Sequence, residues 1–412
     1  MHGDVKGAFL SDTDTTNVTG TELWPEGDFA DANEWSSAGA EWTISGGTAT
    51  VSDGNGGYSF LGSSSGTLTN GKKYVLSFTV SNYSGGRLEA SQANSSNIQI
   101  PFSANGSYSQ LINYTGTSGS GLGMYGYGGG AVGFTLDNLY LRELEEEDRS
   151  VNNTGLAVYG TITKSAVATG AELVKYGGFS SSNALVQPYN SDMDWGTGDF
   201  YYMIWVYHRD HTGLHGIISR QTDGQSSGNR FQFQSDNDGK YDYYSGVSPQ
   251  NNLGSAKLNV WSQLAFVRSG STVTFYQDGY NIRSWTDSTN YTNSGANLRV
   301  GGLSLGSSIA DNSYPADGVD FALFRTGGSA PSPEQIKKIY EDEKVLFQEN
   351  AKATLYGSSD AVTALGYDED TELLHVGTSA GRSDFQGLRR INNTTTAVTT
   401  AISASDDLIA EQ

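Results

Sequence analysis

The nine residues from Phe200 to His208, FYYMIWVYH, carry apolar or aromatic side chains at both positions of a two-residue repeat. In an extended chain, Phe200 and Ile204 fall on one face and Trp205 falls on the other. A strand that is apolar on both faces is buried on both sides, so this pattern predicts an inner strand of a β-sandwich.

The chain continues to Arg325 as short alternating runs of Val, Phe, Tyr, Trp and Thr, separated by Gly, Asn, Asp and Ser. This pattern is typical of successive strands joined by tight turns. The run VTFYQ ends at Gln277, and the pair Asp278-Gly279 predicts a hairpin turn from which YNIRSW returns.

Three segments in this order carry a family resemblance: GTGDF…WVY, then W…LAFVRSGSTVTFYQDGY, then LRVGG…DGVDFALFRTG. Together they resemble the laminin-G-like, concanavalin-A-like jelly-roll domains over residues 155–328. The resemblance implies one complete sandwich in this part of the chain.

Residues 21–144 form a separate β pattern. The stretch SFLGSSSGTLTNGKKYVLSFTVSNYSGG alternates apolar and polar residues, and Asn70-Gly71 predicts a turn before a strand from Tyr74 to Val80. The opening GDF…W…W…GGTATV, the middle GKKYVLSFTVSNYSGG and the closing GFTLDNLYL resemble carbohydrate-binding modules of the jelly-roll type, which occur in glycanases and phage tail proteins. The resemblance implies a first sandwich.

Two polar stretches flank this first domain. Residues 1–20 are rich in Gly, Asp and Thr, and we expect an arm or linker that orders against a partner. Five carboxylates occur in the six residues from Glu143 to Asp148, and such a charge density favours a solvated connector, so residues 145–154 are predicted to be an acidic linker.

The end of the chain changes character. Ser332 as N-cap, Pro333 at the first helical position and Gln335 at the third predict a helix within residues 329–350, docked on the sandwich or on a neighbouring subunit. Residues 351–412 read as a small β module, similar to one propeller blade, which buries too little to stand alone. Together, residues 329–412 resemble the carboxy-terminal module of tail and fibre proteins of marine and cyanobacterial bacteriophages.

The predicted fold class is therefore all-β: two β-sandwich (jelly-roll) domains in tandem, one helix and a small C-terminal β module. Composition agrees, with 53 Gly, 24 Tyr and 7 Pro in 412 residues. A formal charge of −21 disfavours nucleic acid and anionic membranes as partners, and the absence of Cys excludes thiol chemistry. No signal peptide and no apolar run long enough to insert into a membrane are recognised.

Calcium is the one cofactor for which the sequence offers candidates. In the carbohydrate-binding modules, an Asp of the closing DN strand and oxygens near the opening GDF hold a structural calcium, which maps onto Asp137 and Asp28. Asp192 and Asp194, with Asp199, have the alternate spacing of a calcium loop. The alternatives are a strand end at Asp137 and an acidic turn before Phe200.

Aromatic residues are the candidates for sugar stacking, and their alternative role is core packing, which is favoured for Trp35 and Trp42. The glycan-binding candidates are Tyr125, Tyr127, Tyr83 and Tyr108. Tyr125 and Tyr127 lie in SGSGLGMYGYGGG, which is too rich in Gly for a core strand, so an exposed platform is expected there.

The sequence contains residues typical of two other kinds of site, a transition-metal site and a glycanase active site. His208, His211 and His215 with Asp210 have the residue types of a transition-metal site, but loop histidines exposed to solvent are the preferred interpretation. Related sandwiches include glycanases with paired catalytic carboxylates, yet Glu is absent from Lys175 to Pro333, so we predict no enzyme.

These observations predict a virion protein of a tailed phage, made in the host cytoplasm. We expect a tail fibre or adhesin that binds host-surface polysaccharide without catalysis, and that assembles with itself as a homotrimer and with other virion proteins. The alternative is a purely structural virion component, such as a capsid decoration or tail appendage; a polysaccharide-degrading enzyme is the third possibility.

Overall fold

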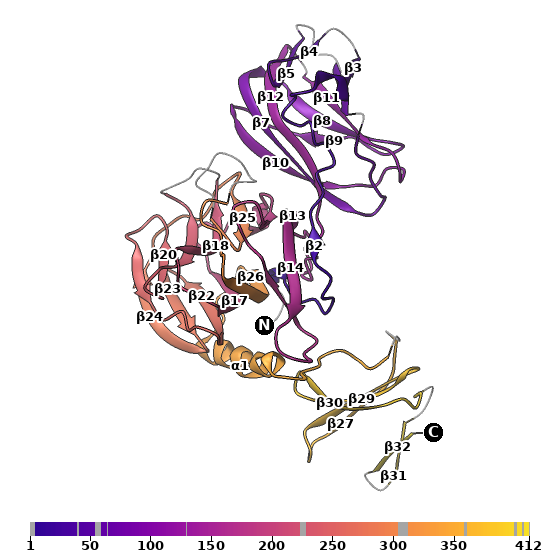
Figure 1. Ribbon diagram of the computed structural model, residues 1–412, viewed down its shortest axis with the longest axis vertical. Helices are drawn as coiled ribbons and strands as arrows, with labels where there is room; N and C mark the ends of the chain where they lie inside the picture. Colours follow the sequence, from indigo (N-terminus) through magenta and orange to yellow (C-terminus); the bar gives the residue numbers. More distant parts are fainter. Residues whose placement is uncertain are drawn as a thin grey trace.

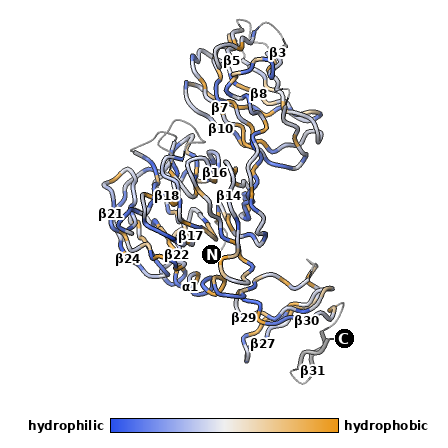
Figure 2. The backbone as a smooth tube through the Cα atoms, in the orientation of Figure 1, coloured by the Kyte–Doolittle hydropathy of each residue, from blue (hydrophilic) through white to orange (hydrophobic). Residues whose placement is uncertain are grey.

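The computed structural model describes residues 5–38, 41–53, 59–63, 65–128, 130–222, 228–303, 312–357, 361–398, 402–405 and 408–411. Two β-sandwiches follow one another along the chain, and a small sheet lies beyond the helix α1 (Figure 1). Figure 2 shows hydrophobic and hydrophilic stretches alternating along the strands of both sandwiches. The predicted all-β, jelly-roll-like fold class is confirmed. Among the described residues, no helix has the length and apolar character needed to cross a membrane.

The first sandwich packs two sheets, each five-stranded over the described residues, around a core that includes Trp24, Trp35 and Trp42. The predicted turn is present, since Gly71 has a φ of 84° just before β7. One sheet has the order β10 (Gly106–Asn113), β7 (Lys73–Gly85), β12 (Val132–Glu143), β5 (Thr48–Asp53), β4 (Trp42–Ser45). The other has the order β3 (Trp35–Ala38), β6 (Ser59–Ser63), β11 (Leu122–Tyr127), β8 (Arg87–Gln92), β9 (Ile98–Ile100). A short 3₁₀ helix, η1 (Ala32–Glu34), leads into β3.

The second sandwich is larger. Over the described residues its first sheet runs β2 (Val18–Thr19), β14 (Thr161–Ala166), β15 (Val174–Gly177), β26 (Val319–Gly327), β17 (Phe200–His208), β22 (Trp261–Ser269), β23 (Thr272–Gln277), β24 (Tyr280–Thr286). Its second sheet runs β13 (Ala157–Tyr159), β16 (Ala184–Gln187), β25 (Asn297–Val300), β18 (His215–Gln221), β19 (Phe231–Ser235), β20 (Tyr241–Tyr244), β21 (Gln250–Leu253).

β17 is the inner strand that the sequence predicts. It pairs with β22 on one side and β26 on the other, and only Tyr207 along it is not fully buried. The predicted hairpin joins β23 to β24, with positive φ at both Asp278 (54°) and Gly279 (79°), as a type I′ turn requires.

The helix α1 (Pro333–Glu343) begins with the predicted capping box of Ser332 and Gln335 and continues as the 3₁₀ helix η3 (Lys344–Phe347). It docks on the outer face of the sheet that contains β17, where Ile336 is fully buried among β17 and β22 side chains. Beneath the helix, Trp205 stacks on Phe347 with ring centroids 4.2 Å apart. The helix therefore belongs to the second sandwich.

The two polar flanks differ from the sequence expectation. Residues 1–20 contain β1 (Val5–Phe9), which pairs with β26, so this stretch completes the second sandwich and is not a free arm. The expected solvated linker is also tied down: Asp148 is buried and accepts hydrogen bonds from the backbone N–H groups of Ala8, Ser150 and Thr154. Charge density alone does not reveal such backbone partners.

The C-terminal module is a sheet of β27 (Val362–Asp368), β28 (Leu373–Thr378), β29 (Gly381–Gln386) and β30 (Arg389–Thr394), followed by the hairpin β31 (Ile402–Ser405) and β32 (Leu408–Glu411). It touches the second sandwich through Glu172, whose carboxylate accepts from the backbone N–H groups of Ala353 and Thr354 and pairs with Arg390. The edge strand β27 leaves Leu365 and Tyr367 mostly exposed.

Candidate functional site

The outer face of the sheet β3-β6-β11-β8-β9 carries the strongest candidate site. Along β11, Leu122 and Met124 point into the core, while Tyr125 and Tyr127 point outward and stay partly exposed. Cross-strand register places Phe60 on β6 and Glu89 on β8 beside Tyr125, and Arg87 beside Tyr127. We call these five side chains, Phe60, Arg87, Glu89, Tyr125 and Tyr127, the aromatic face.

Two glycines allow the Phe60 ring to lie down on the sheet. A Cβ at Gly62 would stand 2.5 Å from Phe60 Cζ, and one at Gly123 would stand 2.8 Å from Phe60 Cε2. The Tyr125 ring meets Phe60 edge-on, with centroids 5.3 Å apart and planes at 61°. The pair forms a partly exposed platform of two rings, fixed by the sheet beneath it.

Arg87 and Glu89 supply fixed polar groups beside these rings. The guanidinium of Arg87 lies 4.4 Å from the centre of the Tyr127 ring, and its Nε and Nη2 donate to Glu89 Oε1 at 3.2 and 2.7 Å. Glu89 is only 4% exposed, so both ends of this ion pair are held in place. Rings that present a flat apolar surface beside fixed donors and acceptors suit sugars, which have apolar ring faces and hydroxyl edges.

A hollow of about 310 Å³ continues the aromatic face beyond Tyr127. Its lining includes Arg87, Tyr127 and Phe102. Tyr83 and Tyr108 flank Phe102, with ring centroids 5.7 and 5.5 Å from it.

The structure thus divides the four predicted tyrosines into two pairs. Tyr125 and Tyr127 lie on the aromatic face, whereas Tyr83 and Tyr108 pack against the core and donate their hydroxyls to the carbonyls of Gly86 and Ala104. Whether any of them binds a glycan stays a prediction.

Sequence reasoning missed Phe60, Arg87 and Glu89, and it was wrong about the segment around Tyr125. That glycine-rich segment is β11, the middle strand of its sheet. The alternation of Leu122, Met124 and Gly126 with outward residues was a usable signal, but the register that brings Phe60 to Tyr125 is not readable from the sequence.

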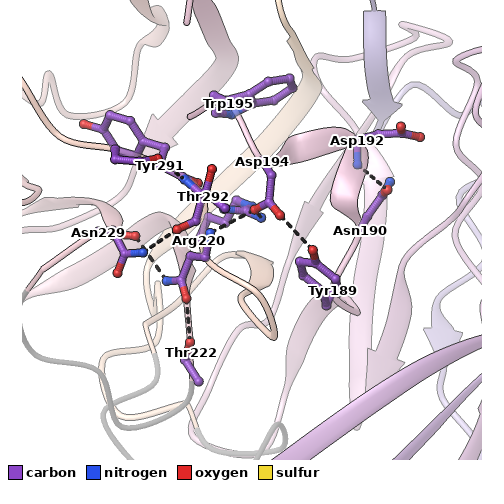
Figure 3. Close-up of polar contacts among 12 residues, drawn as sticks. Tyr189, Asn190, Asp192, Asp194, Trp195, Arg220, Thr222, Asn229, Tyr291 and Thr292 are labelled. Carbon is purple, nitrogen blue, oxygen red and sulfur yellow. Dashed lines mark hydrogen bonds and ion pairs between the residues drawn. The ribbon is translucent and has the colours of Figure 1, made fainter. Parts of the chain in front are cut away.

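The predicted calcium loop lies at the rim of the second sandwich, and Figure 3 shows its contacts. Asp194 Oδ1 accepts from Arg220 Nη2 at 2.5 Å and from the backbone N–H of Asn293 at 3.0 Å, while Oδ2 accepts from the Tyr189 hydroxyl at 2.7 Å. Burial acts to raise the pKa of Asp194, but these donors outweigh it and hold the pKa below its usual value. Asp192 is exposed, and its N–H is capped by Asn190.

These placements do not fit a calcium site. Asp194 is neutralised by a guanidinium, and Asp28 and Asp137 each accept a local backbone hydrogen bond, from Ala30 and Asn138. Within the described ranges, no three His, Asp or Glu side chains are close enough together to hold a metal, whereas calcium takes six to eight oxygens. Calcium at Asp28, Asp137, Asp192 or Asp194 remains a prediction without a fitting ligand set.

The preferred interpretation of the histidines as exposed loop residues is wrong for two of the three. His208 is 1% exposed and His215 is 3% exposed, because both begin or end strands that pack into the sandwich. Burial, together with the neighbouring His215 and His211, lowers the pKa of His208 to about 3. Burial also lowers the pKa of His215, so His208 and His215 are neutral at physiological pH.

Part of the second sandwich matches a known protein family. Residues 180–337 match the concanavalin A-like lectin/glucanases superfamily, so this segment has a lectin-type jelly-roll fold. No curated protein matches the chain.

Among solved structures, the binding domain of Paraclostridial Mosquitocidal Protein 1 is similar at 12% identity and a TM-score of 0.40, over 58% of this chain and 61% of that one. The binding domain of botulinum neurotoxin DC, solved in complex with rat synaptotagmin II, is similar at 12% identity and a TM-score of 0.37, over 60% of each chain. The chain spans about three-fifths of the length of these structures. At such scores the likeness is too loose to bear on function.

Proposed function

We propose that the protein is a non-enzymatic adhesin that binds polysaccharide through the aromatic face of its first sandwich. The observation that carries the proposal is the platform of Phe60 and Tyr125, laid over Gly62 and Gly123 beside the fixed Arg87–Glu89 pair. In this mechanism the rings stack on the apolar faces of sugar units, and the Arg87 and Glu89 side chains form hydrogen bonds with their hydroxyls.

The site is shallow, so each copy binds weakly. Several copies on one particle multiply the binding strength, provided that the sites reach the same surface together. The C-terminal module supports assembly, because its edge strand β27 keeps Val362, Leu365 and Tyr367 more than half exposed. We propose that this module joins copies of the chain, as a homotrimer, and attaches them to other virion proteins.

The proposed setting is a virion of a tailed phage, with the protein as a tail fibre or tail-associated adhesin that contacts host-surface polysaccharide. This part rests on the resemblance of residues 329–412 to phage tail modules. A bare structural spacer is the competing role, and binding data separate the two.

The test is binding of the purified, labelled protein to a panel of bacterial surface polysaccharides, with calcium and then with chelator. We expect selective binding that the double variant Phe60→Ala and Tyr125→Ala abolishes. Tyr280→Ala is the matched control, because Tyr280 is an exposed tyrosine on the second sandwich. If the folded protein binds none of the polysaccharides, the role of structural spacer is favoured. Loss of binding in the presence of chelator would support a calcium site.

A further inference from the structure

A second cleft lies where the two sandwiches meet. It has a volume of about 260 Å³ and is lined by residues 109–111 of β10, by Thr154 and by residues 187–191. The two walls touch at its edge, since the backbone N–H of Tyr189 donates to Ser109 Oγ at 3.3 Å. An occupant of this cleft would contact both sandwiches.

One wall holds a buried hydrogen-bond acceptor that is not used. Gln187 is 1% exposed, and its Nε2 donates to Thr154 Oγ1 at 2.5 Å. The Thr154 hydroxyl itself donates to Asp148 Oδ2, so it must accept from Gln187, and this fixes the orientation of the amide. Gln187 Oε1 is therefore the free end, and it is buried without a partner.

The same wall holds an unused donor. Asn190 Oδ1 accepts from the backbone N–H of Asp192 at 2.9 Å, which fixes its amide in the orientation shown in Figure 3. Its Nδ2 is then buried with no hydrogen-bond partner. Leaving two polar groups unpaired costs free energy, and a ligand that pairs both recovers it.

The lining also defines the chemistry of the ligand. Every lining residue is uncharged: Ser109, Gln110, Leu111, Thr154, Gln187, Pro188, Tyr189, Asn190 and Ser191. The nearby Asp194 pairs with Arg220, and the lining itself offers no charged side chain to an ion. A hydroxyl group both donates and accepts, which matches the free acceptor of Gln187 and the free donor of Asn190.

We propose that this cleft binds a single neutral sugar ring through vicinal hydroxyls, separately from the aromatic face. The volume lies below the roughly 300–1,000 Å³ of pockets for drug-sized ligands, so it admits one ring and not a chain. Leu111, Pro188 and Tyr189 provide the apolar contacts for the ring carbons. The proposal does not depend on polysaccharide binding by the first sandwich.

The test is saturation-transfer NMR and calorimetry on the full chain with four neutral probes: the methyl glycosides of glucose, galactose and mannose, and N-acetylglucosamine. Glucuronate and glucosamine are the charged controls. We expect at least one neutral probe to bind and the charged ones to fail. Losing one neutral hydrogen bond should weaken binding by roughly 3- to 10-fold.

Two variants remove the unused groups. Asn190→Asp retains the oxygen that caps Asp192 and replaces the free donor by an acceptor. Gln187→Met removes the free acceptor at similar length, together with the Nε2 bond to Thr154, so its thermal unfolding is measured beside its affinity. The control is Tyr280→Ala, an exposed tyrosine outside both proposed sites, which should leave binding of the small sugar unchanged.

Reduced affinity in both cleft variants, with normal thermal unfolding, supports the proposal. Three results would overturn it: no neutral probe binds, binding survives both cleft variants, or binding is lost in Tyr280→Ala. Polysaccharide binding is tested with Phe60 and Tyr125 variants, so each of the two proposals can be refuted without refuting the other.

Discussion

The two sandwiches treat the outer faces of their sheets in opposite ways. In the second, the outward side chains of β17 are buried under α1, where Trp205 stacks on Phe347 and donates its indole N–H to Glu343 at 2.7 Å. In the first, the outward side chains of β11, Tyr125 and Tyr127, remain partly exposed. The outer face of a sheet is therefore covered by a helix in the second sandwich and exposed to solvent in the first.

This difference indicates where binding should be sought. A covered face devotes its aromatic residues to packing, as the burial of Trp205 and Ile336 shows. An open face that keeps aromatic rings in contact with water forgoes part of their burial energy, and such a patch on a protein surface marks a contact site. The comparison can be tested by perturbing each face in turn.

The largest expected effect is on the covered face. Trp205→Ala removes a ring that is 2% exposed and leaves Glu343 without its indole donor, so we expect a loss of about 3–5 kcal/mol in the free energy of unfolding. Denaturant unfolding measures it. Tyr125→Ala is the matched change on the open face and should cost less than about 1 kcal/mol. Equal costs for the two variants would refute the comparison.

The next largest effect is expected at acidic pH, which should lower the stability of the second sandwich selectively. The folded-state pKa of His208 is about 3 and that of His215 is also lowered, in both cases mainly by burial. A lowered histidine pKa means that the unfolded chain binds more protons, so stability falls as pH drops from about 6.5 towards 3. Unfolding midpoints across this range measure the effect.

The variant His208→Gln should reduce this loss of stability at acidic pH. The first sandwich contains no histidine and serves as the internal control. Its unfolding is monitored with a probe specific to its tryptophans. An unchanged pH dependence of the unfolding midpoint in His208→Gln would show that other groups cause the loss of stability.

A smaller pH effect of opposite sign is expected at the junction. Burial raises the pKa of Glu145 to about 7, although it accepts hydrogen bonds from the backbone N–H groups of Val158 and Thr21. A raised carboxyl pKa means that the folded chain binds the extra proton, so this contribution is present below pH about 4.5 and is lost as pH rises to about 7. Burial also raises the pKa of Glu22 to about 7, so Glu145→Gln should reduce that slope without removing it, and an unaltered slope would contradict the assignment.

The smallest effect on stability, yet a clear one on binding, is expected at Gly62. A Cβ there would lie 2.5 Å from the Phe60 ring and push it off the sheet, so Gly62→Ala should weaken polysaccharide binding while costing under about 1 kcal/mol. Gly213→Ala is the control, because a Cβ at Gly213 meets no atom within 4 Å. Unchanged binding in Gly62→Ala would show that the Phe60 platform is not used.

The sequence predicts the covered parts of the molecule better than the open ones. The apolar pattern of Phe200–His208, the Asp278-Gly279 hairpin and the capping box at Ser332 all act through local, well-defined physics, and all three are present. The strand β11 escapes prediction because its glycines are needed for the Phe60 ring and the core, which are contacts across strands.

Charge and hydrogen-bond partners escape prediction for a related reason. Asp148 and Asp194 read as solvated or metal-binding carboxylates, but the structure supplies each with partners distant in sequence, such as Ala8 for Asp148 and Arg220 for Asp194. The sequence predicted two of the five residues of the aromatic face, Tyr125 and Tyr127, but Phe60 and the Arg87–Glu89 pair depend on register.

The most direct test of the central claim is hydrogen–deuterium exchange with and without a bound surface polysaccharide. The account predicts slower exchange confined to β6, β11 and β8, the strands that carry the aromatic face, and no such change in Phe60→Ala. Protection confined to the second sandwich, or protection that persists in Phe60→Ala, would contradict it.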